Sequence, residues 1–150
     1  MGELRLVELS AATIVAVNNL SLKPGQEQFL APVSYGVAAT VANPQTSWQR
    51  VVLDRNEVVG FVSANFDPDA PEEHFKSVLW RINVDADDQG RGVGRFAVEG
   101  MLERARELGF DHVNVIYEAG SEGPEAFFLR VGFVPVGETE YGEVIAELRL

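Results

Sequence analysis

The sequence predicts an α/β fold: one domain over residues 1–150, built on a mixed, mostly antiparallel central sheet that helices flank. Segments rich in β-branched and aromatic residues recur along the chain, as in strands. Residues 93–108 carry apolar side chains at helical spacing. This helix stands between two strand-like segments, 77–85 and 112–117, and so provides the crossover that a parallel strand pair requires. A chain of 150 residues is long enough for one core.

The first third predicts one strand and two helical regions. Residues 4–9 alternate between apolar and polar and indicate a strand. Ser10 is a candidate cap for a helix that runs to about Leu20. The Lys-Pro-Gly sequence at 23–25 ends that helix, and a second helical region covers about 26–42.

A β-hairpin and the central strand are expected next. Residues 48–53 and 58–66 are β-rich, and 54–57 connect them. The acidic, proline-rich segment 67–73 fits either a solvated connector or one wall of a cation site. In the strand 77–85, simple alternation assigns two faces. One face is expected to carry Val78, Trp80, Ile82 and Val84, and the other Leu79, Arg81 and Asn83.

The helix over 93–108 is expected to bury a stripe of residues spaced by three and four, and Gly109 is its predicted stop. The stripe consists of Val93, Ala97, Met101, Ala105 and Leu108. Gly100 in the interior is expected to allow close packing, because glycine otherwise costs a helix about 1 kcal/mol. A short helix over 124–132 and an antiparallel pair, 133–137 and 144–150, complete the prediction.

A glycine-rich turn between the central strand and the long helix is the most informative motif. It consists of Gln89, Gly90, Arg91, Gly92, Val93 and Gly94. Few side chains stand in the way there, so backbone N–H groups and the new helix's free N–H groups can converge on a phosphate or pyrophosphate. The alternative is a tight strand-to-helix turn without a ligand. A dinucleotide-binding Gly-x-Gly-x-x-Gly motif is disfavoured, because Arg95 occupies the position of the third glycine.

This hexad resembles the Gln/Arg-x-x-Gly-x-Gly/Ala motif of the GNAT N-acetyltransferases, which bind acetyl-CoA. Residues 127–133, Phe-Phe-Leu-Arg-Val-Gly-Phe, resemble the family's Phe-Tyr-x-x-x-Gly-Phe segment. Residues 80–82, 136–138 and 141–144 resemble the branch with bacterial spermine/spermidine-type acetyltransferases. The resemblance implies a parallel central strand pair that splays apart, with free backbone groups that hold the pantetheine arm and the thioester carbonyl.

The resemblance also implies a set of cofactor-contacting residues. It consists of Ile82, Asn83, Val84, Gln89, Gly90, Arg91, Gly92, Val93, Gly94, Arg95, Ser121 and Phe128. Ser121 stands where many members have asparagine, and Phe128 where many have the tyrosine thought to protonate the departing thiolate. Residues 26–42, with Glu27, Gln28 and Tyr35, correspond to the region that lies over the family's acceptor pocket.

Catalysis requires removal of a proton from the amine, whose pKa is about 10.4 when unperturbed in a lysine-like group. A carboxylate can serve as the general base. Glu118 follows the strand beside the central one, where α/β sites gather, and Glu27, Glu72 and Glu73 are alternatives. Phenylalanine cannot donate a proton. Either Tyr117 or a water molecule therefore replaces the missing acid, or the thiolate leaves unaided.

The net charge of −11 disfavours nucleic acid as a partner and favours a small cationic acceptor such as a polyamine. Coenzyme A is itself anionic, so its binding must depend on local N–H groups with Arg91 and Arg95. No apolar run is long enough to cross a bilayer, no signal peptide is evident, and cysteine is absent, so we expect a cytoplasmic protein. His74 and His112 lack metal-ligand spacing, and no metal is expected.

The predicted function is therefore transfer of an acetyl group from acetyl-CoA to a primary amine by direct attack in a ternary complex. The alternative is an acetyl-CoA-binding module with little or no activity, because Phe128 replaces the usual acid. The sequence leaves a monomer and a homodimer both open.

Overall fold

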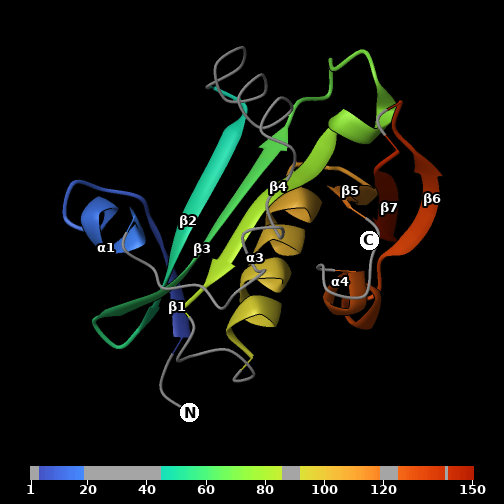
Figure 1. Ribbon diagram of the computed structural model, residues 1–150. Coiled ribbons are helices and arrows are strands. Elements are labelled where there is room, and N and C mark those ends of the chain that lie inside the picture. The colour runs from blue at the N-terminus through green and yellow to red at the C-terminus, as the bar shows by residue number, and fades with distance from the viewer. Residues whose placement is uncertain (1–3, 19–44, 86–91, 119–124, 141) are drawn as a thin grey trace.

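A computed structural model describes residues 4–18, 45–85, 92–118, 125–140 and 142–150 (Figure 1). The strands in these ranges are β1 (Leu4–Glu8), β2 (Ser47–Asp54), β3 (Glu57–Phe66), β4 (Ser77–Val84), β5 (His112–Tyr117), β6 (Val134–Glu138) and β7 (Val144–Arg149). The helices there are α1 (Ile14–Asn18), the short 3-10 helix η2 (Glu73–Phe75), α3 (Val93–Glu107) and α4 (Glu125–Val131). The expected helical region over 26–42 lies outside the described residues.

The described strands form one mixed sheet in the order β1-β2-β3-β4-β5-β7-β6. The β4–β5 pair is parallel, and the other described neighbours are antiparallel. Helix α3 makes the crossover between the two parallel strands and lies in front of the sheet in Figure 1. These features confirm the predicted fold class, including a parallel central pair within an otherwise antiparallel sheet.

The main core lies between the sheet and helices α3 and α4. Helix α3 buries Val93, Ala97, Val98, Met101, Leu102 and Ala105. Leu108 was expected in this stripe but is 45% exposed, because the helix ends at Glu107 and Leu108 is its C-cap. Gly109 ends the helix as predicted, with a φ of +89°. At Gly100 a Cβ atom would come within 2.2 Å of Leu6, which confirms that this glycine allows close packing.

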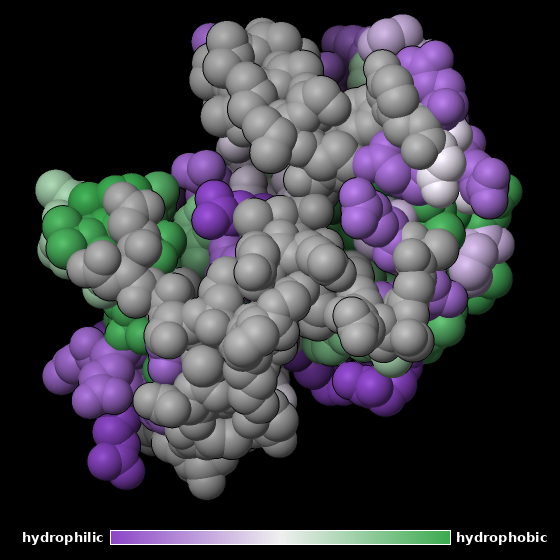
Figure 2. Space-filling model, in the orientation of Figure 1, coloured by the Kyte–Doolittle hydropathy of each residue, from purple (hydrophilic) through white to green (hydrophobic). Residues whose placement is uncertain are grey.

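A second apolar cluster covers the opposite face of β2 and β3. It contains Val51, Leu53 and Phe61, with Val17 of α1 packed against them. The predicted helix after Ser10 starts later than expected, because Ser10 and Thr13 form a hydrogen-bonded turn and the helix begins at Ile14. Figure 2 shows apolar side chains on the outer surface of α1, where Val15 is 65% exposed.

The predicted alternation along β4 is wrong. Ser63 pairs with Arg81 and the next residue, Ala64, pairs with Leu79, so Trp80 is an extra residue between these two pairs, which is a β-bulge. Leu79 and Ile82 therefore both join the main core, whereas Val78 and Trp80 pack with Phe75 on the opposite face. Beyond the bulge, Arg81 and Asn83 lie opposite Ser63 and Phe61, on the face away from α3.

Candidate active site

The parallel pair β4–β5 separates toward its carboxyl end. The two strands pair only at Val78 with Asn114 and at Leu79 with Val115. Beyond these positions, residues 81–83 of β4 pair with β3 on one side and form no described pair with β5 on the other. One edge of the β4 backbone is therefore available to a ligand, at the end of the sheet where α/β sites form.

The N-terminus of α3 lies against this opening. A Cβ atom at Gly94 would lie 3.7 Å from Val84, the last residue of β4. Gly92 is the N-cap in the left-handed region, with φ +86°, and no described side chain caps the helix. The first turn contains no acidic residue. The first N–H groups of the helix and its positive dipole end therefore favour an anion.

Helix α4 packs directly on this N-terminus. A Cβ atom at Gly94 would lie 3.1 Å from the ring of Phe127, so this ring would have to shift by a few tenths of an ångström to admit a larger residue. Arg95 donates to the carbonyl of Arg130 at 3.3 Å and lies 3.8 Å from Glu99. The absence of a side chain at Gly94 thus serves helix packing as well as an open turn.

Tyr117 and Phe128 form a stacked pair beside the opening. Tyr117 is the last residue of β5, and its ring lies 5.6 Å from that of Phe128 at an interplanar angle of 21°. Both side chains are 2% exposed. The Tyr117 hydroxyl has no hydrogen-bond partner within the described ranges. Burial raises the pKa of Tyr117, and the negative charge of Glu125 raises it further, so the phenol stays protonated near neutral pH.

Two polar side chains of β4 occupy the other face of the opening. The Nε of Arg81 donates to the Oδ1 of Asn83 at 2.8 Å. Asn83 is 6% exposed, and its Nδ2 has no hydrogen-bond partner in the part of the chain that the structure describes. Arg81 is exposed and its guanidinium lies 5.9 Å from the centre of the Phe61 ring. The opening therefore has unsatisfied donors on both faces of the sheet.

A parallel strand pair that opens beside an uncapped helix is the arrangement expected for an acetyl-CoA-binding fold, and the comparison with known families decides the question. The model of the acetyltransferase (GNAT) family matches residues 18–133. The chain belongs to the GNAT family.

Known relatives agree with this assignment. The chain is 29% identical over 83 residues to N-acetyltransferase 8F1 of Rattus norvegicus, a match that covers 55% of this chain and 38% of the relative. It is 28% identical over 81 residues to L-2,4-diaminobutyric acid acetyltransferase of Shouchella clausii, covering 54% and 44% respectively. The chain thus matches less than half the length of these two curated relatives.

A solved structure is similar over nearly the whole chain. PaiA N-acetyltransferase from Thermoplasma acidophilum, in complex with coenzyme A, has a TM-score of 0.74, with 10% identity and 99% of both chains covered. At this identity the likeness concerns the fold. The structure of this GNAT chain thus agrees with the fold that its sequence motifs predicted.

The GNAT site residues expected from sequence are only partly within the described ranges. One described group lies at the end of β4 and the start of α3 and consists of Ile82, Asn83, Val84, Gly92, Val93, Gly94 and Arg95. The other consists of Tyr117 on β5, Glu118 directly after it and Phe128 on α4. Glu118 is exposed directly after β5. Glu27, Gln89, Gly90, Arg91 and Ser121 lie outside the described residues. Arg81 was not predicted as a site residue, although its place two residues before Asn83 was a usable signal.

Glu72 and Glu73 do not lie at the opening. Glu73 belongs to η2, and its Oε1 lies 3.8 Å from the Nε2 of His112, the first residue of β5. Tyr117 is five residues further along the strand, roughly 16 Å at about 3.3 Å per residue. Glu72 lies 3.0 Å from His74. Neither carboxylate of this GNAT chain therefore lies beside the strand opening.

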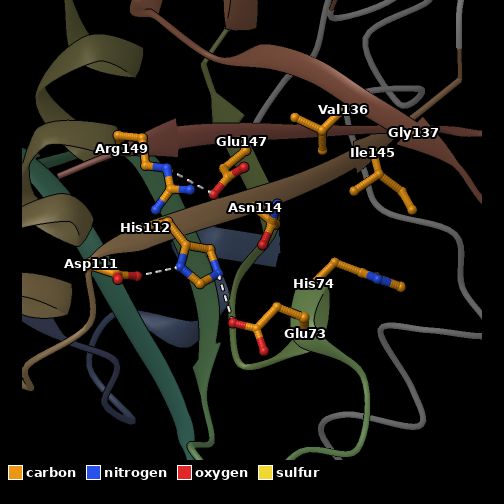
Figure 3. A pocket seen from close by; sticks show the side chains of 10 residues that line it. All are labelled: Glu73, His74, Asp111, His112, Asn114, Val136, Gly137, Ile145, Glu147 and Arg149. Carbon is orange, nitrogen blue, oxygen red and sulfur yellow. Dashed lines mark hydrogen bonds and ion pairs between the residues drawn. The ribbon is translucent and has the colours of Figure 1, made fainter.

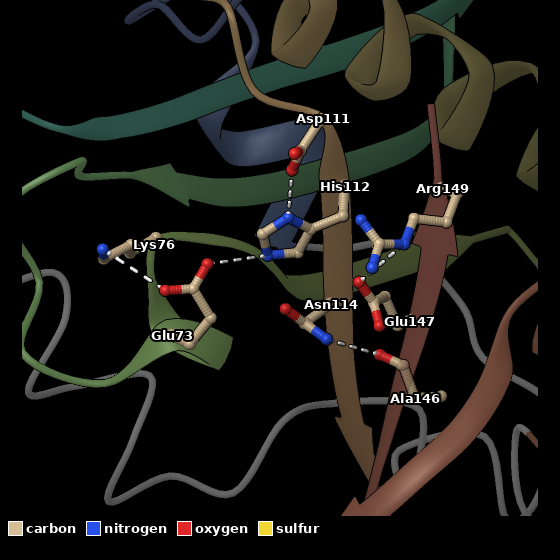
Figure 4. Close-up of polar contacts among 8 residues, drawn as sticks. All are labelled: Glu73, Lys76, Asp111, His112, Asn114, Ala146, Glu147 and Arg149. Atoms are coloured by element: carbon tan, nitrogen blue, oxygen red, sulfur yellow. Dashed lines mark hydrogen bonds and ion pairs between the residues drawn. The ribbon is translucent and has the colours of Figure 1, made fainter.

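A pocket of about 420 Å³ lies on the sheet face away from α3 (Figure 3). It is lined by Glu73, His74, Asp111, His112, Asn114, Val136, Gly137, Ile145, Glu147 and Arg149. Many of its polar groups already pair with one another, as Figure 4 shows. Glu147 lies 3.3 Å from Arg149, Glu73 lies 3.3 Å from Lys76, and Asn114 donates to the carbonyl of Ala146. These contacts connect η2, β5 and β7.

The His112 side chain already has polar partners. It is 7% exposed, and its Nδ1 lies 2.6 Å from Asp111. The hydrogen bond and the charge of His112 hold the pKa of Asp111 below its usual range, although burial opposes this shift. An ionised carboxylate only accepts, so the His112 Nδ1–H donates. Among the described residues no cluster of His, Cys, Asp and Glu could hold a metal ion, and no helix is long and apolar enough to cross a membrane.

The Asp111 contact predicts a specific pH dependence of stability. Because the folded pKa is lowered, its stabilisation is present above the unfolded pKa of about 3.9 and is lost as pH falls through the folded value. Asp111→Asn should therefore lower the free energy of unfolding at pH 6, and the difference from wild type should shrink as pH falls below about 3.9. Urea unfolding at several pH values measures this, with exposed Glu103→Gln as the control. An undiminished difference at the lowest pH would contradict this origin.

Proposed function

We propose that the chain is one domain over residues 1–150 that transfers the acetyl group of acetyl-CoA to a primary amine of a small, cationic acceptor. The two substrates would react directly in a ternary complex. The observation that carries this proposal is the segment of β4 beyond its last described pair with β5, beside the N-terminus of α3, which no described side chain caps. A cytoplasmic location and a mechanism without metal, as expected from the sequence, belong to the same proposal.

The residues around the opening fit acetyl-CoA. The proposed pyrophosphate site spans residues 89–95, where the described part offers the left-handed Gly92 and the first N–H groups of α3. The backbone N–H groups near Asn83 or Val84 are the proposed donors to the thioester oxygen, because this part of β4 lies beyond the last described pair with β5, at Leu79. Acetyl-CoA supplies the activated acetyl group, and these residues bind and orient it.

Proton transfer is assigned to groups at the ends of β4 and β5. We propose Glu118, which is exposed at the end of β5, as the general base, with Glu27 as the alternative. Tyr117 is the proposed hydrogen-bond donor to the departing sulfur. Its ring stacks on Phe128, the residue at the usual acid position, and its hydroxyl has no hydrogen-bond partner in the described part of the chain. Because burial raises the pKa of Tyr117, it stabilises a thiolate by hydrogen bonding more readily than by full proton transfer.

The net charge of −11 favours an acceptor that is polyamine-like in carrying more than one positive charge. The apparent KM of this acceptor should rise as ionic strength increases from 20 to 300 mM, because salt screens long-range attraction. Release of the coenzyme A thiol, measured with several amines, tests the activity and this dependence together. A monoamine, which carries only one positive charge when protonated, is the control. Equal rates for all amines without any salt effect would contradict a cationic acceptor.

The second candidate function is a non-catalytic acetyl-CoA-binding module, favoured by Phe128. Calorimetry with acetyl-CoA separates it from the enzyme. Binding of acetyl-CoA without thiol release for any amine would support the module, whereas turnover would exclude it.

A further inference from the structure

We infer that the acceptor amine also carries a carboxylate, which Arg81 binds with the help of Asn83. This inference rests on the proposed acetyl transfer and specifies its second substrate. A diamino acid has this chemistry, because it keeps a net positive charge while presenting one carboxylate. A simple polyamine does not.

The first observation is the unsatisfied amide of Asn83. The side chain is 6% exposed, and its Nδ2 is buried without a hydrogen-bond partner among the described residues. Its Oδ1 accepts from Arg81, which fixes the orientation of the amide, since a flipped amide would place two donors face to face. A buried donor without an acceptor is destabilising, and a native structure retains one where a ligand supplies the acceptor.

The second observation is the free guanidinium beside this amide. The chain carries 23 acidic and 12 basic residues, yet no described carboxylate lies within ion-pair distance of Arg81. The hydrogen bond to Asn83 uses Nε, so the two Nη groups remain available on an exposed side chain. Arginine in this state binds a planar carboxylate with two parallel hydrogen bonds.

The position of the pair points to the acceptor and not to the cofactor. Arg81 and Asn83 lie on the strand segment that has lost its β5 partner. Their side chains share the sheet face of Phe61, whereas α3 and Phe128 pack on the other face. The cofactor's phosphates are proposed at the α3 side. A second substrate approaching from the opposite face therefore meets Arg81 and Asn83 next to the proposed thioester site.

The charge of Arg81 also discriminates between acceptor classes. A polyamine would bring only cations to a free guanidinium at the opening, which is repulsive. A diamino acid is attracted by the overall negative charge and then places its carboxylate on Arg81. The ammonium groups of such a molecule are thus attracted by the overall negative charge, and its carboxylate is attracted by Arg81. Its side-chain amine is left to react.

Matched pairs of substrates test the inference. Lysine and cadaverine, ornithine and putrescine, and 2,4-diaminobutyrate and 1,3-diaminopropane each differ by one carboxylate. We expect the amino acid of at least one pair to have a kcat/KM about 10-fold to 100-fold above that of its diamine. Equal or higher values for all three diamines would overturn the carboxylate site while leaving acetyl transfer intact. Absence of turnover with every compound would overturn both.

Variants of the pair identify the residues. Arg81→Gln should raise the KM of the preferred amino acid about 10-fold or more, with little change for its diamine or for acetyl-CoA. Asn83→Asp should also raise the KM of the amino acid, because the new carboxylate pairs with Arg81 and repels the carboxylate of the substrate. Arg106→Gln, which removes the same charge from the exposed end of α3, is the control. An altered KM for acetyl-CoA alone would assign Arg81 to the cofactor and overturn the inference.

Discussion

A Gly92→Val variant should lose about 30-fold to 100-fold of its affinity for acetyl-CoA, equivalent to about 2–3 kcal/mol. Gly92 has φ +86°, a conformation that a β-branched residue rarely adopts. Valine would shift this turn and place methyl groups beside the first N–H groups of α3, where the pyrophosphate is proposed to bind. Calorimetry with acetyl-CoA measures the loss directly.

The other end of the same helix provides a matched control for this variant. Gly109 has φ +89°, and a Cβ atom there would meet nothing within 4 Å. Gly109→Val should therefore cost comparable backbone strain without touching the proposed cofactor site. We expect it to lower stability and to leave acetyl-CoA affinity unchanged. Equal affinity losses in the two variants would show that general destabilisation, and not the turn at Gly92, explains the effect.

Gly94 requires a different interpretation from the one its motif suggested. The sequence predicted that its missing side chain serves the approach of a phosphate. The structure adds that a Cβ atom would come within 3.1 Å of Phe127, so substitution would also displace the Phe127 ring. Residue type alone does not distinguish these roles, because the contact depends on a helix more than thirty residues away. Gly92 is the cleaner test of cofactor binding.

The fold was largely predictable because its signals are local. The hairpin of β2 and β3, the helix stop at Gly109 and the parallel crossover all follow from periodicity and glycine positions. The face assignment of β4 failed, since the bulge at Trp80 arises from pairing with β3 and interrupts the alternation. The same bulge helps to place Arg81 and Asn83 together on the face opposite α3, which explains why Arg81 was missed as a site residue.

The site was predictable where a motif specifies backbone geometry and less so where it depends on side-chain contacts. The glycine-rich turn was evident from the sequence, and so was the phenylalanine at position 128 in place of the usual tyrosine acid. The isolation of the Tyr117 hydroxyl, its stacking on Phe128, and the pairing of Glu73 with His112 required coordinates. Tyr117 had been only one of three ways to replace the missing acid.

Tyr117→Phe should lower kcat by about 10-fold to 100-fold with little change in the KM of either substrate. General acid assistance is typically worth about 10²–10⁴-fold, and a thiolate of pKa about 8.5 needs less of it than a poorer leaving group. A hydrogen bond that forms as charge develops on sulfur stabilises the transition state and not the bound substrates, so kcat and kcat/KM should fall together. Steady-state kinetics at saturating acetyl-CoA separate the two constants.

Phe128→Tyr is the complementary variant, for which a gain in kcat is expected. Its hydroxyl would extend from a ring that stacks on Tyr117, at the position where the family usually carries the acid. We expect this change to raise kcat several-fold in the wild type and by a larger factor in the Tyr117→Phe background, because only one donor to the sulfur is needed. Thermal unfolding of each variant controls for the cost of placing a hydroxyl in this buried stack. A Tyr117→Phe enzyme with normal kcat would show that the thiolate leaves without Tyr117, and a collapse of kcat in Phe128→Tyr would show that the apolar ring itself is required.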